Sequence, residues 1–196
     1  MSNNAEIPIT KLLIGIRLCQ ELIESYIKDA QKYRSENNYQ LAYLLGFSAW
    51  EECGKAYYIL DYQQKNKPIP RREWTNTKSF MGHIPKLRKA REEGIKNAFE
   101  DLKERRPEYP NIHLVDFEAQ PSKLKQYWNY RNNCLYLHYD FKDESWNTYK
   151  DYEKLESLTE RVISNAVISF IDLQDTLRRK GIETQWTHLA TFEIKI

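Results

Sequence analysis

Residues 41–60 read LAYLLGFSAWEECGKAYYIL, and this stretch decides the fold because apolar and aromatic side chains occupy most of it. Wound at about 100° per residue, a helix over this stretch is apolar on almost all sides. A helix of that kind is stable only when other elements cover it, so we expect it at the centre of a bundle. Its aliphatic face is formed by Leu45, Ala49, Cys53, Ala56 and Leu60. Its aromatic flank is formed by Tyr43, Trp50 and Tyr57.

Three charged residues interrupt this apolar helix, namely Glu51, Glu52 and Lys55. Helical spacing places Glu51 and Lys55 on the side opposite the aliphatic face, with Glu52 between the two. Buried charges persist only when they are paired, hydrogen-bonded or turned towards a polar cleft. The charges therefore indicate either an internal ion-pair network, with Glu51 and Lys55 paired at i,i+4 spacing, or the wall of a site.

The composition favours a single all-α domain. The chain has 196 residues but only 6 glycines and 7 prolines, and it is rich in Lys, Glu and Leu. This length suits one domain with a sizeable core, and no linker or repeat divides it. We therefore expect residues 1–196 to form one bundle of about five helices, followed after Gly181 by a short tail that could be extended.

Charge and targeting signals narrow the protein class. The 30 basic and 28 acidic residues nearly cancel, so bulk charge gives no argument for nucleic-acid binding. Three cysteines without CxxC spacing favour reduced thiols, and the N-terminus lacks the pattern of a signal peptide. No apolar run approaches the roughly 20 residues that span a bilayer. We expect a cytoplasmic protein that does not contact the membrane.

Apolar spacing and helix breakers predict the order of the elements. The predicted boundaries are a first helix from Pro8 to Asn37, a second that fades over 63–67, a basic loop at 68–72, a third helix from His83, an irregular loop at 107–121, a fourth helix from Ser122 to about Tyr139 and a fifth from Leu155 to Gly181. A glycine after three basic residues is typical of a helix C-cap.

Arg131 and His138 are the first candidates for chemistry. They are seven residues apart, so on a continuous helix they share a face about 10 Å apart. A His can take the proton of a ribose 2′-hydroxyl or protonate the leaving oxygen, and an Arg can hold the phosphate. Asn132 could orient either group. The alternative is a structural Arg and a hydrogen-bonded His at an interface, and the spacing alone does not decide between them.

His83 and Lys86 lie at the predicted start of the third helix. A helix N-terminus can receive an anion, so a phosphate site is conceivable, and a capping region with a solvated lysine is the alternative. Glu51, Glu52 and His83 do not have the Glu-x-x-His spacing of a helical metal site. We expect neither a metal nor another cofactor.

Three blocks together resemble the AbiV family of abortive-infection proteins. They occur in the family's order, and the resemblance covers residues 10–175 approximately. The blocks read Ala49-Trp50-Glu51-Glu52-Cys53-Gly54-Lys55-Ala56, Phe80-Met81-Gly82-His83-Ile84-Pro85-Lys86 and Arg131-Asn132-Asn133-Cys134-Leu135-Tyr136. The family pattern is similar to Glu-Glu-x-Gly-Lys, His-x-x-Lys, and Arg followed by Leu-Tyr. In that pattern Leu-Tyr is often followed by Val-Asp, so His138 stands where relatives carry an acid.

The resemblance implies a HEPN-type fold, a compact helical bundle that is often a homodimer and often a metal-independent endoribonuclease. It implies a phage-defence protein that acts on RNA or the translation machinery and that a phage protein could activate. The implied catalytic residues are Arg131, His138 and Asn132, and in a dimer the Arg131/His138 pairs would face each other. The implied supporting polar cluster consists of Glu51, Glu52, Lys55, His83, Lys86 and Tyr136.

Two other functions fit the same residues. The protein could be a non-catalytic effector that binds the ribosome, RNA or a phage protein, with the charged residues as a buried ion-pair network. It could also be the toxin of a toxin–antitoxin pair.

Overall fold

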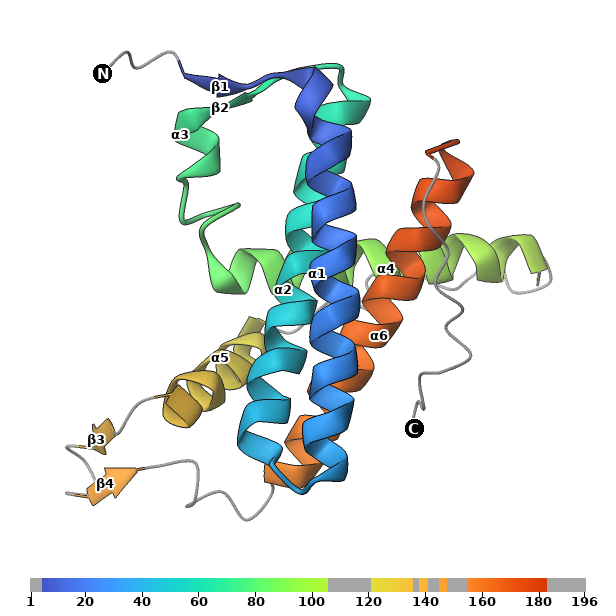
Figure 1. Cartoon of the computed structure of the whole chain (residues 1–196). Coiled ribbons are helices and arrows are strands. Elements are labelled where there is room, and N and C mark those ends of the chain that lie inside the picture. The colour runs from blue at the N-terminus through green and yellow to red at the C-terminus, as the bar shows by residue number, and fades with distance from the viewer. Residues whose placement is uncertain (1–4, 106–120, 136–137, 141–144, 148–154, 183–196) are drawn as a thin grey trace.

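The computed structural model describes residues 5–105, 121–135, 138–140, 145–147 and 155–182, and this part of the chain is almost entirely helical (Figure 1). The helices are α1 (Ile9–Ser35), α2 (Tyr39–Gln64), α3 (Arg71–Trp74), α4 (His83–Arg105), α5 (Pro121–Leu135) and α6 (Leu155–Arg179). The strands are β1 (Glu6–Ile7), β2 (Ile69–Pro70), β3 (His138–Asp140) and β4 (Ser145–Asn147). The predicted all-α bundle is confirmed.

Helix α2 is the centre of the bundle, as its all-round apolar surface predicts. It contacts α1, α4, α5 and α6, and its largest side chains, Trp50, Tyr43 and Tyr57, are at most 2% exposed. Helix α1 covers α2 with one apolar face, and α6 adds a second. The residues of α6 that recur at helical spacing and are buried there are Val162, Ala166, Ser169, Leu173 and Leu177.

Local sequence signals set several helix ends. Asn37 has a positive φ of 59° between α1 and α2, and the side chain of Asn38 accepts a hydrogen bond from the backbone of Leu41 at 3.3 Å. At the end of α6, Gly181 has a φ of +67°. The Ile182 amide there donates to the Leu177 carbonyl at 3.0 Å, which is the closing bond of a glycine C-cap.

Gly54 allows α2 and α4 to approach closely. A Cβ atom at this position would lie 1.9 Å from the backbone oxygen of Lys86, which is less than a van der Waals contact. Only glycine therefore permits the two backbones to cross here. The crossing brings the start of α4, with His83 and Lys86, against the charged stretch of α2.

The predicted extent of the fourth helix is wrong at its C-terminal end. Helix α5 ends at Leu135, and His138 begins β3, whose register pairs Tyr139 with Trp146 of β4. Aromatic residues favour strands, and pairing with β4 satisfies backbone groups that a longer helix would otherwise satisfy internally. Arg131 and His138 therefore do not share a helix face.

The predicted basic loop at 68–72 is also corrected. Ile69 and Pro70 form β2, which pairs with β1, and α3 begins at Arg71. Ile69 is fully buried, so its side chain draws this segment onto the bundle. The predicted irregular loop at 107–121 lies outside the described residues except for Pro121, which begins α5, and the predicted tail (residues 183–196) also lies outside them.

None of the helices in the described part of the chain combines the length and hydropathy that a membrane span requires.

Candidate active site

Glu51 is the buried centre of a polar cluster between α2 and α4. This residue is 6% exposed, and its carboxylate contacts Nδ1 of His83 and lies 3.7 Å from Nζ of Lys86. His83 and Lys86 are three residues apart at the start of α4, so both reach the same carboxylate oxygen. A neutral His83 protonated at Nδ1 donates to Glu51 and leaves Nε2 free to accept a proton.

His83 is fixed on a second side by Trp128 of α5. The two rings stack with centroids 3.9 Å apart and an interplanar angle of 20°. The imidazole side chain remains 35% exposed. Burial lowers the pKa of His83 below its usual value, the Glu51 carboxylate opposes this change, and Lys86 and Arg131 add to it. The neutral form, which can act as a base, is therefore favoured at neutral pH.

Arg131 lies over the same tryptophan. Its guanidinium carbon is 4.8 Å from the Trp128 ring centroid and 5.7 Å from that of Phe47 in α2. These distances are typical of cation–π contacts. The guanidinium also donates to the Asn132 side chain at 3.4 Å. Trp128 thus connects the cation of Arg131 with the imidazole of His83.

Glu52 and Lys55 form a separate pair beside this cluster. Lys55 contacts Glu52, so the predicted Glu51–Lys55 pair is wrong: Glu51 points towards α4 and Glu52 towards α1. The Cys19 thiol of α1 donates to Glu52 at 3.6 Å. Burial, together with the Glu52 carboxylate, raises the pKa of Cys19 to about 12, so this thiol stays protonated and is not a nucleophile.

The structure brings some of the predicted site residues together. Glu51, His83, Lys86 and Arg131 are linked through direct contacts or through Trp128, and Asn132 is bonded to Arg131. The backbone of His138 lies in β3, and its side chain lies outside the described part of the structure. Tyr136 lies outside the described residues.

Sequence reasoning missed the role of Trp128. It precedes Arg131 by three residues, so the two side chains share a face of α5. That spacing was a usable signal for a cation–π contact. The stacking partner His83 could not be found from spacing, because it comes from another helix.

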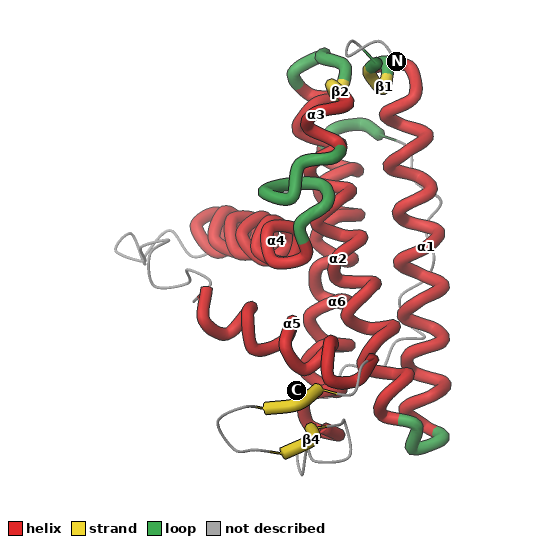
Figure 2. The backbone as a smooth tube through the Cα atoms, turned by 90° about the vertical axis from the view of Figure 1, so that its left-hand side faces the viewer, coloured by secondary structure: helices red, strands yellow, loops and turns green. Residues whose placement is uncertain are grey.

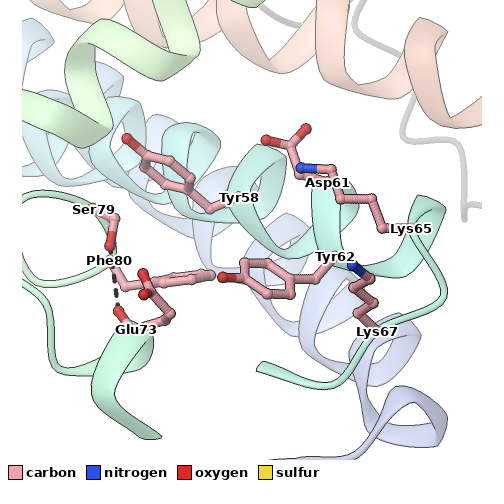
Figure 3. A pocket seen from close by; sticks show the side chains of 8 residues that line it. All are labelled: Tyr58, Asp61, Tyr62, Lys65, Lys67, Glu73, Ser79 and Phe80. Atoms are coloured by element: carbon pink, nitrogen blue, oxygen red, sulfur yellow. Dashed lines mark hydrogen bonds between the residues drawn. The ribbon is translucent and has the colours of Figure 1, made fainter. Parts of the chain in front are cut away.

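A pocket of about 380 Å³ lies further along α2, away from this cluster (Figure 3). Its wall is aromatic, with Phe80 packed 5.3 Å from Tyr58 and 6.2 Å from Tyr62 between ring centroids. One of its carboxylates, that of Asp61, already pairs with Lys89 at 2.7 Å. The pocket and the polar cluster share no lining residue, so we treat them as different features.

The residues that the structure describes contain no group of three or more His, Cys, Asp or Glu side chains arranged to hold a metal ion. The cluster around Glu51 instead mixes one carboxylate with cations, which suits a negatively charged ligand more than a metal.

Two side chains of the polar cluster can act on a phosphodiester. Arg131 presents a guanidinium that can bind a phosphate, and His83 presents an exposed nitrogen that can accept a proton. Glu51 holds the imidazole through Nδ1, as carboxylates do in other acid–base sites. Trp128 stacks on His83 and lies under the Arg131 guanidinium, so it fixes the positions of both groups.

Comparison with known proteins gives one match. The family model described as AbiV, a HEPN domain, matches residues 11–169. No curated protein matches the chain, and no solved structure does. The matched region includes all three sequence blocks and every residue of the polar cluster.

Proposed function

The chain belongs to the AbiV family of HEPN-type domains, and from this premise we propose that it is an abortive-infection protein that stops phage multiplication by cleaving RNA. Its targets would be RNA or the translation machinery, and a phage product would activate it.

One observation carries the proposal: Glu51 fixes the His83 imidazole, and Trp128 supports both that imidazole and the Arg131 guanidinium. Metal-independent RNA cleavage requires at least a proton acceptor and a group that binds the phosphate, and here both contact the same tryptophan. The partial exposure of His83 leaves room for a substrate to reach the ring.

We assign the roles as follows. Arg131 binds the scissile phosphate and stabilises the charge that develops on its oxygens. His83 removes the proton of the ribose 2′-hydroxyl, whose oxygen then attacks the phosphorus. Glu51 positions His83, and Lys86 balances the charge of Glu51. The bond from phosphorus to the 5′-oxygen breaks, which yields a cyclic phosphate and a protonated 5′-hydroxyl.

His138 remains the candidate that the sequence suggests for protonating the leaving oxygen. It lies three residues after the end of α5, the helix that carries Arg131. Asn132 is proposed to hold the guanidinium in position through its side-chain oxygen.

The test is cleavage of total RNA by purified protein, with and without extract from phage-infected cells. His83→Gln and Arg131→Ala are each expected to lower the cleavage rate by about 100-fold or more. Arg72→Gln, on the exposed face of α3, removes a positive charge elsewhere and should leave the rate unchanged.

The ribonuclease proposal fails if wild type does not cleave RNA under any of these conditions. It also fails if His83→Gln and His138→Ala both protect cells from phage as well as wild type does. Normal melting temperatures of the variants are required before either result is interpreted.

A non-catalytic effector is the second candidate, because the Arg131 guanidinium, held over the Trp128 ring, is a cation that can bind an RNA phosphate without cutting the RNA. In that case Trp128→Leu abolishes both defence and RNA binding, and His83→Gln leaves both intact. Toxicity in uninfected cells would instead support a toxin of a toxin–antitoxin pair.

A further inference from the structure

The pocket at the end of α2 has two ends of opposite charge. Lys65 and Lys67 lie at one end, and Glu73 lies at the other (Figure 3). Both lysines are exposed, and Glu73 is half-buried. Tyr62 lies between the two ends and is also half-buried. The pocket therefore offers cations, an aromatic side chain and a carboxylate in that order.

The charges at both ends are available to a ligand. Among the described residues, Lys65, Lys67 and Glu73 form no ion pair. Asp61 also lines the pocket, but its carboxylate is already paired with Lys89 at 2.7 Å. A ligand with a negative group at the lysine end and a hydrogen-bond donor at the Glu73 end would match these charges.

Aromatic packing fixes the shape of the pocket. Phe80 is 2% exposed and packs against Trp74 of α3 at 5.0 Å between ring centroids. It also packs against Tyr58 and Tyr62 of α2. These contacts join α3 and the connection before α4 to the end of α2. Because Phe80 is covered, the half-buried Tyr58 and Tyr62 supply the aromatic surface that a ligand can reach.

The pocket and the polar cluster lie on the same face of α2. Tyr58 and Tyr62 follow Glu51 by two and three helical turns, so the three side chains point to one side. Tyr58 lies about 10 Å from Glu51 along the helix axis. Figure 2 looks onto this side, where α3, the connection and the start of α4 follow one below another, with α5 below α4. A strand held in the pocket therefore has a short path to His83.

We propose that the pocket binds one nucleotide of the RNA strand on which the polar cluster acts, an inference that rests on the proposed function. Lys65 and Lys67 bind the phosphate of this nucleotide. The two tyrosines contact its base, and the Glu73 carboxylate accepts a hydrogen bond from an amino group of the base. A nucleotide carries its phosphate and its base at opposite ends, as the pocket requires. The volume of about 380 Å³ lies in the range of small-ligand sites.

Glu73 determines which bases the pocket accepts. Cytosine presents an amino group that donates a hydrogen bond, whereas uracil presents a carbonyl oxygen at the same ring position. The carboxylate accepts a hydrogen bond from the amino group and repels the carbonyl oxygen. The pocket therefore prefers cytosine to uracil.

An acidic segment of a protein is the alternative ligand, and it matches the pocket less well. Its carboxylates would bind Lys65 and Lys67, but Glu73 at the other end would repel them. The position of the pocket beside His83 also favours RNA, because a nucleotide bound there belongs to a strand that the polar cluster can reach.

The first test measures binding of a short fluorescent RNA made only of cytidine, by fluorescence anisotropy. The parent protein is the full chain with His83→Gln, which prevents cleavage. Lys65→Gln together with Lys67→Gln should raise the dissociation constant by about 10-fold or more. The salt dependence of log K should become shallower by about 0.7 or more, the value for one phosphate of a single strand. The matched control, Arg17→Gln with Lys32→Gln, removes two exposed charges from α1 and should bind like the parent.

The second test compares cytidine RNA with uridine RNA of the same length. The parent protein should bind the cytidine strand about 10-fold more tightly. Glu73→Ala should remove this preference, whereas the double lysine variant should weaken both strands equally. A parent protein that binds both strands equally would overturn the role of Glu73.

Competition identifies the ligand of the pocket. Cytidine monophosphate should displace the labelled strand only at about 100-fold higher concentration than unlabelled cytidine RNA, because it lacks the phosphate that Arg131 binds. Equal competition by cytidine monophosphate would assign the pocket to free nucleotides and overturn its assignment to a strand. Equal competition by a glutamate peptide would overturn nucleotide recognition.

Failure of this inference and failure of the ribonuclease proposal give different results. If the protein cleaves RNA but the pocket variants bind and cleave as their parents do, the inference alone is overturned. If the pocket variants lose RNA binding but wild type never cleaves, the ribonuclease proposal alone is overturned. A parent protein that binds neither RNA also overturns the inference.

Discussion

At the scale of single residues, neighbouring acids in α2 have different environments. Glu51 is buried and shared by His83 and Lys86, whereas Glu52 pairs with Lys55 nearer the surface. Removing Glu51 leaves Lys86, whose side chain is 9% exposed, without its carboxylate. The penalty for such an unpaired buried charge is a few kcal/mol, about 3–5 in known cases.

Glu51→Ala should therefore lower the free energy of unfolding by about 3 kcal/mol or more. Glu52→Ala should cost about 1 kcal/mol or less, because its partner Lys55 is 24% exposed and can be hydrated. Urea denaturation of both variants measures the difference. Equal losses would contradict the assignment of Glu51 as the buried member.

Gly54→Ala should destabilise the protein although alanine favours helices. The added Cβ would lie 1.9 Å from the Lys86 backbone oxygen, so α4 must move away. We expect a loss of about 3 kcal/mol, measured by urea denaturation. In the control Gly15→Ala, the new Cβ lies 3.5 Å from Ile59, an ordinary contact. That change should be neutral or stabilise by up to about 1 kcal/mol.

The protonation of His83 should respond to its two charged neighbours in opposite directions. Burial lowers its pKa below 6.5, and Glu51 opposes that change while Lys86 adds to it. NMR titration should therefore find a lower pKa in Glu51→Gln and a higher pKa in Lys86→Met than in wild type. A pKa that stays the same in both variants would contradict the described cluster.

The same pKa sets a pH dependence of stability. The folded protein binds the His83 proton less tightly than the unfolded chain does. The stability that neutral His83 contributes is therefore present above about pH 6.5 and is lost as the pH falls through its lowered pKa. This loss should be smaller in His83→Gln.

At the scale of elements, α5 is held to the bundle by a few specific contacts. The Tyr43 hydroxyl donates to the Tyr127 carbonyl at 2.8 Å, and Trp50 meets the Tyr127 ring edge-on at 5.6 Å between centroids. Helix α5 carries both Trp128 and Arg131, so its docking determines where Arg131 lies relative to His83. A change that loosens α5 should affect the site before it affects the core.

Tyr43→Phe should therefore act mainly on α5. It removes one buried hydrogen bond and should cost about 1–2 kcal/mol. Hydrogen exchange of the α5 amides should become faster, while that of α1 stays near wild type. The control is Tyr39→Phe, because the Tyr39 hydroxyl bonds Asn37 at the exposed start of α2. Equal acceleration in α1 and α5 would indicate a global effect instead.

At the scale of the whole molecule, two surfaces lie on opposite sides of α2. Exposed aliphatic side chains lie on α1 at Ile14, Leu18 and Leu22, and the cluster around Glu51, on the α4 side of α2, is proposed to act on RNA. An active site built from two copies of the chain would lose activity on dilution, whereas a site that one copy completes would not.

One chain supplies Glu51, His83, Trp128 and Arg131 to the proposed site, so ribonuclease activity per chain should stay constant when the protein is diluted. The measurement is the initial cleavage rate against protein concentration. A rate per chain that falls with dilution would place two copies in one active site.

The sequence by itself determined the helical class and the central position of α2, because an all-round apolar surface at helical spacing has no stable place except the interior. It also determined most helix ends, through Asn37–Asn38, Pro8 and Gly181. It misplaced the end of α5. The residues after α5 pair with β4 instead of continuing the helix, and no periodic pattern in the sequence marks such a pairing between strands.

Only the tertiary structure decided which charges meet. The i,i+4 spacing favoured a Glu51–Lys55 pair, but the crossing at Gly54 brings His83 and Lys86 to Glu51 and leaves Lys55 to Glu52. Spacing describes neighbours within one helix, whereas a buried carboxylate takes its partners from whichever helix packs against it. The site therefore depends on the packing of α4 and α5 on α2.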